Sequence, residues 1–320
     1  MSDPVWDPLH LPSQLGKTFV VTGGNAGIGY FTSEQLAGAG ARVIVASRSA
    51  EKTAVALASI RSRVPGPELE HVRLDLTSLA SVRSAAAAIR ELGPIDGLVN
   101  NAGLVISPRR RTLTEDGLEI LVGGNALGHF ALTAQVFPAL APGGRVVGLG
   151  SMSTRMVRLD PSDLMSERTY RPFRAYAFSK HAVHGFAFEL DRRLRSAGDS
   201  RRSLLAHPGF ALSALADPRP DVTDQAPGRR FAEKALFTLV GQGKDRGAWP
   251  SVRAMTDPNA ESGTFFGPSR LLLTGIPAPL APVTSSASPE FGAHLWALAE
   301  EKTGVEFRIP DPPVVEPVET

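Results

Sequence analysis

The sequence predicts an α/β fold, a doubly wound parallel sheet with helices on both faces. Short apolar runs alternate with stretches of helical length from about residue 17 onward. Most of these runs lack strict alternation of apolar and polar residues, as strands do when helices cover both faces of a sheet. A turn signal such as Gly or Asn follows each run, which favours a regular succession of strand, loop and helix.

Six runs are predicted to be strands because they are short and apolar and end at turn residues. In chain order they are KTFVVTG (17–23), ARVIVAS (41–47), LEHVRLDL (69–76), IDGLVNNAG (95–103), GRVVGLGS (144–151) and SLLAHPG (203–209). The intervening stretches have helical length and helix-forming composition. They cover residues 27–39, 50–62, 78–91, 114–140 and 173–197.

We expect residues 1–275 to form a single domain with one core. Repeated prolines interrupt the alternation at about 208–260, and an insertion beyond the carboxyl end of a strand is a usual place for a pocket cover. Residues 276–308 are expected to form a C-terminal extension with one helix at 289–303. The Pro-rich residues 309–320 are expected to be a disordered tail.

Composition excludes several functional classes. A formal net charge of only +2 does not support nucleic-acid binding. The basic cluster Arg109–Arg111 is interpreted as a solvated loop, with a contact to a phosphate or an acidic substrate as the alternative. The chain has no Cys, which removes disulfides and thiolate chemistry and means that redox chemistry needs a borrowed cofactor. No signal peptide is recognised and no apolar run approaches bilayer-spanning length, so we expect a cytoplasmic protein without a membrane span. No metal site is expected, because the four histidines considered stand without a ligand framework: His129, His181, His184 and His207.

The stretch VVTGGNAGIGY predicts a nucleotide-binding loop between the first strand and the first helix. Gly23, Gly27 and Gly29 permit a tight turn and a close approach of the backbone to a pyrophosphate, which amide groups at the helix start can hold. In this context the predicted sheet is of the Rossmann type. The loop residues expected to bind the cofactor with these glycines are Thr22, Asn25 and Ile28.

The end of the second strand indicates which dinucleotide is bound. Residues 43–50 contain no carboxylate that could accept hydrogen bonds from a free ribose 2′-hydroxyl, and they offer Ser47 and Arg48 instead. A guanidinium favours a 2′-phosphate through charge and geometry, so NADP(H) is preferred over NAD(H). The alternative is that Arg48 is merely solvated at a strand end.

The motifs TGGNAGIG, LDL (74–76), NNAG (100–103), YAFSK (176–180) and HPG (207–209) occur in the order seen in classical short-chain dehydrogenases/reductases. The resemblance covers roughly residues 15–270. GNALGHFALT (124–133) and the C-terminal LWALAEEKTGV are most similar to the branch of retinol-dehydrogenase-like and protochlorophyllide-reductase-like proteins.

This resemblance implies further cofactor contacts. Asp75 would contact the adenine, although it could simply be a helix cap or strand-end carboxylate, and Leu76 would supply backbone beside it. NNAG can also serve as turn chemistry. Ser213 stands where the family often has the Thr that contacts the nicotinamide carboxamide. The remaining implied cofactor residues are Asn101, Ala102, Gly103, Pro208 and Gly209.

Tyr176 and Lys180 are candidates for proton transfer. Hydride transfer to a carbonyl leaves negative charge on oxygen, so a proton donor must lie within hydrogen-bond reach. A free phenol has a pKa near 10, and a nearby cation lowers it. Because positions i and i+4 share a helix face, we expect the Lys180 ammonium to approach both Tyr176 and the cofactor ribose. An incidental pair is the alternative.

Two further positions match the family's catalytic set. Ser151 follows the fifth strand, where its hydroxyl could orient a substrate carbonyl, and Asn125 would hold a water that links the lysine to solvent. Gly148 and Gly150 precede Ser151 and are expected to loosen its strand. Tyr30, just past the glycine loop, receives no role.

We therefore expect an NADP(H)-dependent oxidoreductase that interconverts a carbonyl and an alcohol on a small apolar substrate. Two alternatives stay open: reduction of a C=C bond, and a non-catalytic NADP(H)-binding sensor or scaffold. The resemblance implies a homo-oligomer, a dimer or a tetramer, although the C-terminal segment could alter that. The apolar pocket is inferred from residues of the covering segment that could equally be core: Phe210, Leu212, Leu215, Phe231, Leu236 and Trp249.

Overall fold

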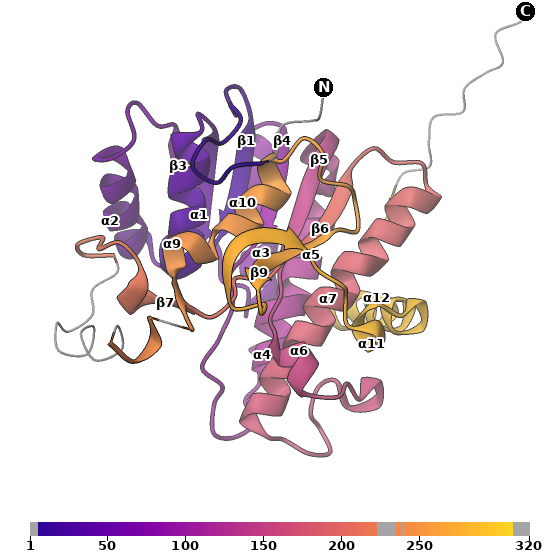
Figure 1. The fold of residues 1–320 in the computed structure, drawn as a ribbon. Helices are drawn as coiled ribbons and strands as arrows, with labels where there is room; N and C mark the ends of the chain where they lie inside the picture. Colours follow the sequence, from indigo (N-terminus) through magenta and orange to yellow (C-terminus); the bar gives the residue numbers. More distant parts are fainter. Residues whose placement is uncertain (1–5, 223–234, 239, 310–320) are drawn as a thin grey trace, which may run out of the picture.

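A central eight-stranded sheet organises the computed structural model, which describes residues 6–222, 235–238 and 240–309 (Figure 1). The strand order is β10-β9-β6-β5-β4-β1-β2-β3, and all neighbours are parallel except β9 and β10. The predicted doubly wound α/β fold is confirmed. The sheet strands are β1 (Thr18–Thr22), β2 (Arg42–Ser47), β3 (Leu69–Arg73), β4 (Ile95–Asn100), β5 (Leu140–Leu149), β6 (Arg202–Ala206), β9 (Phe265–Arg270) and β10 (Thr274–Pro279).

Helices cover both faces of this sheet (Figure 1). Successive side chains of a strand point to opposite faces, so Val20 joins one buried cluster while Phe19 and Val21 join the other. The first cluster packs against α3 (Leu79–Glu91), α5 (Gly128–Val136), α7 (Pro172–Ser196) and α12 (Pro289–Thr303). The second packs against α1 (Gly27–Gly38), α2 (Ala50–Arg61) and α10 (Trp249–Thr256).

The strand order reverses at β1 and β4. After β3 the chain crosses back to place β4 on the free side of β1, so the loops that follow β1 and β4 diverge over opposite faces. In open α/β sheets this reversal leaves a crevice at the carboxyl ends of the strands, where ligands bind.

Two strands of the main sheet were missed because they contain residues that disfavour strands. β9 carries Gly267 and Pro268, and the edge strand β10 carries Pro277 and Pro279. Pro lacks a ladder donor, so it is tolerated where a strand has an unpaired side. The two-stranded sheet of β7 (Ala211–Leu212) and β8 (Gln242–Gly243) was also not predicted.

The helix predicted at 114–140 begins later and is not uniform. Leu113 and Glu119 form an isolated bridge around a turn in which Gly117 has φ 78°, and α4 starts only at Ile120. The segment then runs through α4 (Ile120–Val122), a π-helical turn η1 (Gly123–Leu127), α5 and a 3-10 turn η2 (Phe137–Ala139).

By length and apolar composition, the stretch Ile120–Ala139 could cross a membrane, so the expectation that no apolar run approaches that length was wrong here. Its most apolar window is 83% buried inside the protein, as in the core helix of a soluble fold, and is therefore weak evidence for a span. Phe130 in this stretch packs edge to face against Phe186 and Trp296.

The segment expected at 208–260 to cover the pocket is described in part. It contributes β7, β8, the short helix α9 (Lys244–Gly247), α10 and the 3-10 turn η4 (Ser213–Leu215), whereas residues 223–234, including Phe231, lie outside the described residues. The expected tail also lies outside them, apart from Ile309. Two further short helices are α6 (Ser153–Met156), which follows β5, and α11 (Thr284–Ala287), which precedes α12.

The last helix, α12, packs on α7 and α5 and completes the core. Trp296 is 2% exposed, stacks on Phe307 with ring centroids 4.9 Å apart, and lies under the Arg193 guanidinium at 4.1 Å. Ser288 caps the helix by accepting a hydrogen bond from Phe291 N at 3.1 Å.

Replacing Trp296 with Ala should therefore destabilise the whole domain. Loss of a buried indole and the cavity left behind cost about 3 to 5 kcal/mol of the free energy of unfolding, measured by urea denaturation. The exposed neighbour His294 is the matched position on the same helix, and His294→Ala should change stability by less than about 0.5 kcal/mol. If Trp296→Ala lowers the free energy of unfolding by no more than His294→Ala does, the C-terminal helix contributes little to the core.

Candidate functional site

The glycine loop is held against the end of β4 by close packing. Gly23 and Gly27 have φ of 65° and 58°, a region that favours glycine. A Cβ on Gly29 would overlap the carbonyl oxygen of Gly23 and the side-chain amide of Asn101. The loop can therefore adopt this course only with glycine at position 29.

Thr22 joins the ends of β1 and β4. Its Oγ1 accepts hydrogen bonds from the backbone N–H groups of Asn101 at 3.0 Å and Ala102 at 2.9 Å. In return, Asn101 Nδ2 donates to the Thr22 carbonyl oxygen at 2.8 Å. The side chains of Thr22 and Asn101, both predicted to bind cofactor, are thus used to fix the loop backbone.

The start of α1 presents its first amide groups without a side-chain cap. Its N-cap residue, Ala26, makes no side-chain cap hydrogen bond, and the first turn has no acidic residue. The first amide groups of a helix lack intrahelical partners and carry partial positive charge, so an uncapped N-terminus attracts an anion. Asn25 and Ile28, beside this point, are half-buried. This cradle fits the pyrophosphate of a dinucleotide.

At the end of β2, Ser47 and Arg48 differ in their exposure to solvent. The Ser47 side chain is buried, and its hydroxyl contacts the hydroxyl of Thr53 and lies 3.4 Å from His71 Nε2. Arg48, the next residue, is exposed at the carboxyl edge of the sheet. Arg48 is therefore the better placed of the two to meet a ribose phosphate, which stays a prediction.

Asp75 and Leu76 form the turn between β3 and α3. Asp75 Oδ1 accepts hydrogen bonds from Thr77 N at 3.0 Å and Thr77 Oγ1 at 2.7 Å, so this oxygen stabilises the turn. Leu76 is buried, and its carbonyl oxygen packs so closely on Gly128 that a Cβ there would overlap it. The contact of Asp75 with adenine stays a prediction.

The HPG segment turns at the end of β6. Gly209 has φ 72°, and a Cβ on it would overlap the Leu273 carbonyl oxygen in the turn between β9 and β10. The carbonyl oxygen of Pro208 accepts a hydrogen bond from Gln242 Nε2 at 2.8 Å. Ser213 begins η4 and is half-buried.

Tyr176 and Ser151 meet above the carboxyl end of β5. Tyr176 lies in the first turns of α7, and Ser151 follows Leu149, the last residue of β5. Burial raises the pKa of the Tyr176 phenol above its ordinary value of 10.0, and a hydrogen bond with Ser151 acts in the opposite direction. Ser151 is thus the side chain that offsets part of the effect of burial on this phenol.

Lys180 carries its charge into the protein interior. Its side chain is 5% exposed, and Nζ donates to the Leu149 carbonyl oxygen at 2.7 Å. The ammonium lies 6.0 Å from the centroid of the Tyr176 ring. In this arrangement the pKa of Tyr176 is raised, so activation of the phenol by Lys180 stays a prediction.

Asn125 occupies the π-helical turn η1, an irregularity that often marks functional sites. Its Oδ1 accepts from Leu104 N at 2.7 Å, while Nδ2 donates to Leu104 O at 3.1 Å and to Ser179 Oγ at 3.0 Å. A Cβ on Gly103 would lie 3.2 Å from Asn125 Oδ1 and 3.7 Å from Lys180 Nζ. A side chain at position 103 would therefore crowd both the Asn125 amide and the Lys180 ammonium.

His129 links Asn125 to the glycine loop, a role that was not predicted from the sequence. Burial lowers its pKa to about 4, so the imidazole is neutral at pH 7. Nδ1 lies 2.9 Å from the Asn125 carbonyl oxygen and must donate, so Nε2 accepts from the Thr22 hydroxyl at 2.9 Å. The available signal was spacing, because His129 stands one helical turn after Asn125.

The other histidines set aside as packed or solvated are buried. His181 Nδ1 contacts Ser286 Oγ at 2.6 Å, and His207 Nε2 lies 3.1 Å from the Leu272 carbonyl oxygen. Ser151 N donates to His184 Nε2 at 3.4 Å, so His184 supports the turn that carries Ser151. Among the described residues, no group of three His, Asp or Glu side chains could hold a metal ion.

Gly148 and Gly150 tighten the packing of β5, contrary to the expectation that they loosen it. A Cβ on Gly148 would lie 3.3 Å from Val183 Cγ1, and one on Gly150 would overlap the imidazole of His184. β5 pairs with β4 on one side and β6 on the other. The glycines let α7 approach the strand, which brings Tyr176 and Lys180 to Ser151.

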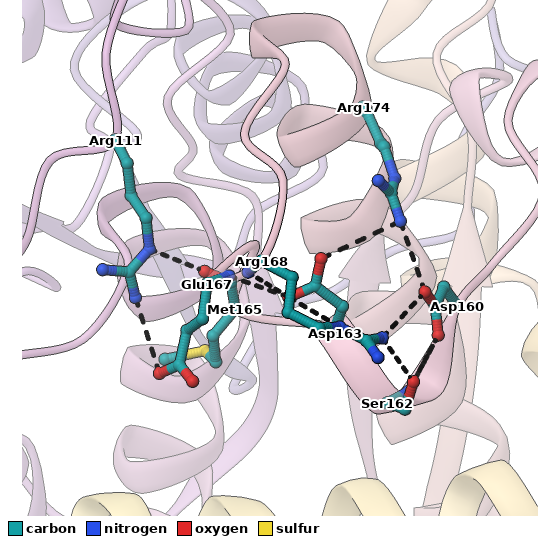
Figure 2. Close-up of polar contacts among 8 residues, drawn as sticks. All are labelled: Arg111, Asp160, Ser162, Asp163, Met165, Glu167, Arg168 and Arg174. Carbon is teal, nitrogen blue, oxygen red and sulfur yellow. Dashed lines mark hydrogen bonds and ion pairs between the residues drawn. The ribbon is translucent and has the colours of Figure 1, made fainter.

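Two loops beside the site are tied together by ion pairs and hydrogen bonds (Figure 2). Arg111 donates from Nε to the Met165 carbonyl oxygen at 3.0 Å and pairs with Glu167 at 3.6 Å. The second loop is also tied to α7, where Arg174 pairs with Asp160 at 3.4 Å (Figure 2). Arg111 is therefore not simply solvated, as the interpretation of the cluster had it. Arg109 and Arg110 are exposed, in agreement with that interpretation.

Tyr30, which received no role from the sequence, is a core residue. Its ring is fully buried, and its hydroxyl lies 2.8 Å from Ser59 Oγ and donates to Glu34 Oε1 at 3.1 Å. These contacts join α1 to α2.

Comparison with known proteins gives consistent matches. The family model described as short chain dehydrogenase matches residues 17–216. Polyprenol dehydrogenase of Mus musculus is 36% identical over 306 residues, covering 93% of this chain and 87% of the relative. Retinol dehydrogenase 13 of Homo sapiens is 35% identical over 301 residues, covering 91% of this chain and 86% of the relative.

Solved structures agree with this match. An uncharacterized protein from Mycobacterium paratuberculosis has a TM-score of 0.77 at 34% identity, covering 96% of this chain and 100% of that chain. A short chain dehydrogenase from Burkholderia cenocepacia in complex with NADP has a TM-score of 0.59 at 25% identity, covering 82% and 97%.

Burial of Lys180 should cost stability in a pH-dependent way. Burial lowers its pKa from 10.5 to about 8. Between these values the unfolded chain binds more protons than the folded one, so the cost is full below pH 8 and is relieved as pH rises toward about 10.5. Lys180→Met should therefore raise the free energy of unfolding by about 2 kcal/mol at pH 7, after allowing for the lost hydrogen bond.

The measurement is urea denaturation of both proteins at pH 7 and pH 10, where the gain should largely disappear. Lys302→Met is the matched control, because Lys302 is an exposed lysine of α12 and should show no such pH-dependent gain. A gain of equal size at both pH values would contradict the burial argument.

Proposed function

This chain belongs to the short-chain dehydrogenase family, as its motifs predicted, and we propose that it is an NADP(H)-dependent oxidoreductase that interconverts a carbonyl and an alcohol on an apolar, lipid-like substrate. The observation that carries the proposal is the convergence of four side chains at the carboxyl ends of β4 and β5. Ser151 opposes the rise that burial causes in the pKa of the Tyr176 phenol, and Lys180 Nζ donates to the Leu149 carbonyl oxygen. The Cβ position of Gly103 lies 3.2 Å from Asn125 Oδ1 and 3.7 Å from Lys180 Nζ.

These residues can manage the proton of such a reaction. A bound nicotinamide cofactor donates or accepts the hydride at the substrate carbon. In the reductive direction, Tyr176 gives its phenolic proton to the substrate oxygen, and the Ser151 hydroxyl orients that oxygen. In the oxidative direction, Tyr176 takes the proton from the alcohol.

Lys180 supplies the positive charge that this exchange needs. With a pKa of about 8 it is mostly protonated at pH 7, so it brings a cation to a buried site. A cation near the phenolate lowers the pKa of a tyrosine that burial alone raises. Asn125 holds Leu104 and Ser179 and so fixes the loop that borders the ammonium.

The preference for NADP(H) rests on Arg48. It is exposed directly after β2, in a stretch without a carboxylate, so it can pair with a ribose 2′-phosphate. The NADP complex of the Burkholderia cenocepacia short chain dehydrogenase supports this preference by analogy.

The apolar substrate is supported by side chains next to the catalytic set. Val105 and Ile106 follow the NNAG turn and are 72% and 91% exposed, while Met156 and Phe173 flank Ser151 and Tyr176 in the chain. Exposed apolar groups beside a polar site suit an alcohol with a long hydrocarbon body. The curated relatives named for polyprenol and retinol, both isoprenoid alcohols, point to the same class.

Tyr176→Phe tests the acid/base assignment. Loss of the phenolic proton should lower kcat for retinol and polyprenol oxidation with NADP about 100- to 10,000-fold. The Kd for NADPH, measured by fluorescence, should stay within about twofold because the ring is retained. Tyr170→Phe is the matched control and should keep activity, since the Tyr170 hydroxyl donates to the Pro108 carbonyl oxygen at 2.8 Å, away from the catalytic set.

Unchanged turnover in Tyr176→Phe would refute the assignment. If the parent protein binds NADPH but turns over no carbonyl or alcohol in a broad panel, a binding role is favoured. If only the C=C bond of enones is reduced, the alternative activity, reduction of a C=C bond, is favoured.

Arg48→Ala tests the cofactor preference. Removing the guanidinium should raise the Kd for NADPH about tenfold or more, because a charge-assisted pair with the 2′-phosphate is lost. NADH lacks that phosphate and serves as the internal control, so its Kd should hardly change. Equal weakening of both cofactors would show that Arg48 does not read the 2′-position.

A further inference from the structure

Lys244 brings a side-chain cation to the glycine loop from a distant part of the chain. It is the first residue of α9 and half-buried. Its Nζ lies 3.5 Å, and its Cδ 3.9 Å, from the point that a Cβ on Gly27 would occupy. Gly27 is the first residue of α1, so the ammonium lies at the turn where that helix begins.

The backbone around Lys244 is fixed from both sides. Before it, Gln242 pairs with Ala211 in the short sheet, donates to Pro208 O at 2.8 Å and accepts from Gly275 N at 3.1 Å. After it, the carbonyl oxygen of Asp245 accepts from Gln35 Nε2 of α1 at 2.8 Å. The position of the lysine is therefore set by contacts with the HPG turn, β10 and α1.

Helix α9 lies directly beside the glycine loop and α1 (Figure 1). A Cβ on Gly247 would lie 2.7 Å from Ala211 Cβ and 3.7 Å from Ile28 Cγ1. Glycine at 247 thus permits the close approach that lets Lys244 reach Gly27.

Lys244 supplies a full positive charge at a helix start that otherwise offers only partial charges. The amide groups of α1 carry only partial charge, and the cap residue Ala26 makes no side-chain hydrogen bond to them. A dinucleotide pyrophosphate carries two negative charges. An ammonium at hydrogen-bond range from a phosphate oxygen forms a charge-assisted bond. Lysine, with a flexible stem and a compact charge, suits a phosphate that the loop already orients.

We propose that Lys244 is a pyrophosphate-binding residue of the cofactor site, contributed by the segment after β6. This inference rests on the proposed function, because it takes the ligand to be a nicotinamide dinucleotide. The pyrophosphate is common to NADPH and NADH, so Lys244 binds both without distinguishing them. In this it differs from Arg48, whose proposed partner is the 2′-phosphate.

The test is the dissociation constant of NADPH and of NADH for Lys244→Gln, measured by fluorescence at fixed salt. Loss of one charge-assisted bond should raise both constants about tenfold and by a similar factor. Inorganic pyrophosphate should compete with NADPH for the parent protein and compete more weakly for the variant. Lys302→Gln, which removes an exposed lysine on α12, should leave all three values unchanged.

Lys244→Arg keeps the charge and should restore most of the affinity, which separates loss of charge from misfolding. Constants within twofold of the parent for both cofactors would overturn the proposal, as would weakening confined to NADPH. If the parent protein binds neither cofactor, the proposed function itself fails. If instead the parent protein binds both cofactors and the Lys244→Gln variant binds them equally well, only the proposed role of Lys244 fails.

Discussion

The hydrogen bonds between Thr22 and the end of β4 are the contact on which the rest of the site depends. One hydroxyl accepts from Asn101 N and Ala102 N and, through its single proton, faces the neutral His129. A hydroxyl has one proton and two lone pairs, so all its hydrogen-bonding capacity is used here. The glycine loop, the NNAG turn and the helix that carries Asn125 are thereby held in one arrangement, and a change in any of them moves the others.

Buried polar groups make this arrangement specific and also costly. Lys180 is charged in the interior and donates to a carbonyl oxygen, and the neutral His129 is satisfied at both ring nitrogens. Burying an ammonium against a carbonyl dipole, which carries only partial charge, destabilises a fold, and residues that are unfavourable for stability cluster at functional sites. The dense apolar packing of α7 and α12 on the sheet supplies the stability that tolerates such a group.

The sequence predicted the fold well because its main signals are local. Six apolar runs ending in turn residues became β1 to β6, and Gly23 and Gly27 adopt the positive φ that a tight loop requires. Strands β9 and β10 were missed because their glycine and prolines are strand breakers unless the strand lies at or near an edge. The effect of Gly150 was misjudged for a related reason: the close approach of His184 is a tertiary contact, which no local pattern contains.

In the candidate site, too, the contacts that follow from local spacing were predicted, whereas the tertiary contacts were not. Tyr176 and Lys180 share a helix face, so their proximity follows from spacing, whereas the proximity of Lys244 to Gly27 depends on a short parallel sheet pair and one glutamine from α1. The hydrogen bonds of the Gln242 side chain tie that segment to Pro208 and Gly275 at once. If Lys244 binds pyrophosphate as proposed, binding the cofactor also stabilises the position of α9 and of the β7–β8 pair that follows the HPG turn. Cofactor and pocket cover would then stabilise one another, because any ligand that binds a segment in one position raises the free energy needed to displace it.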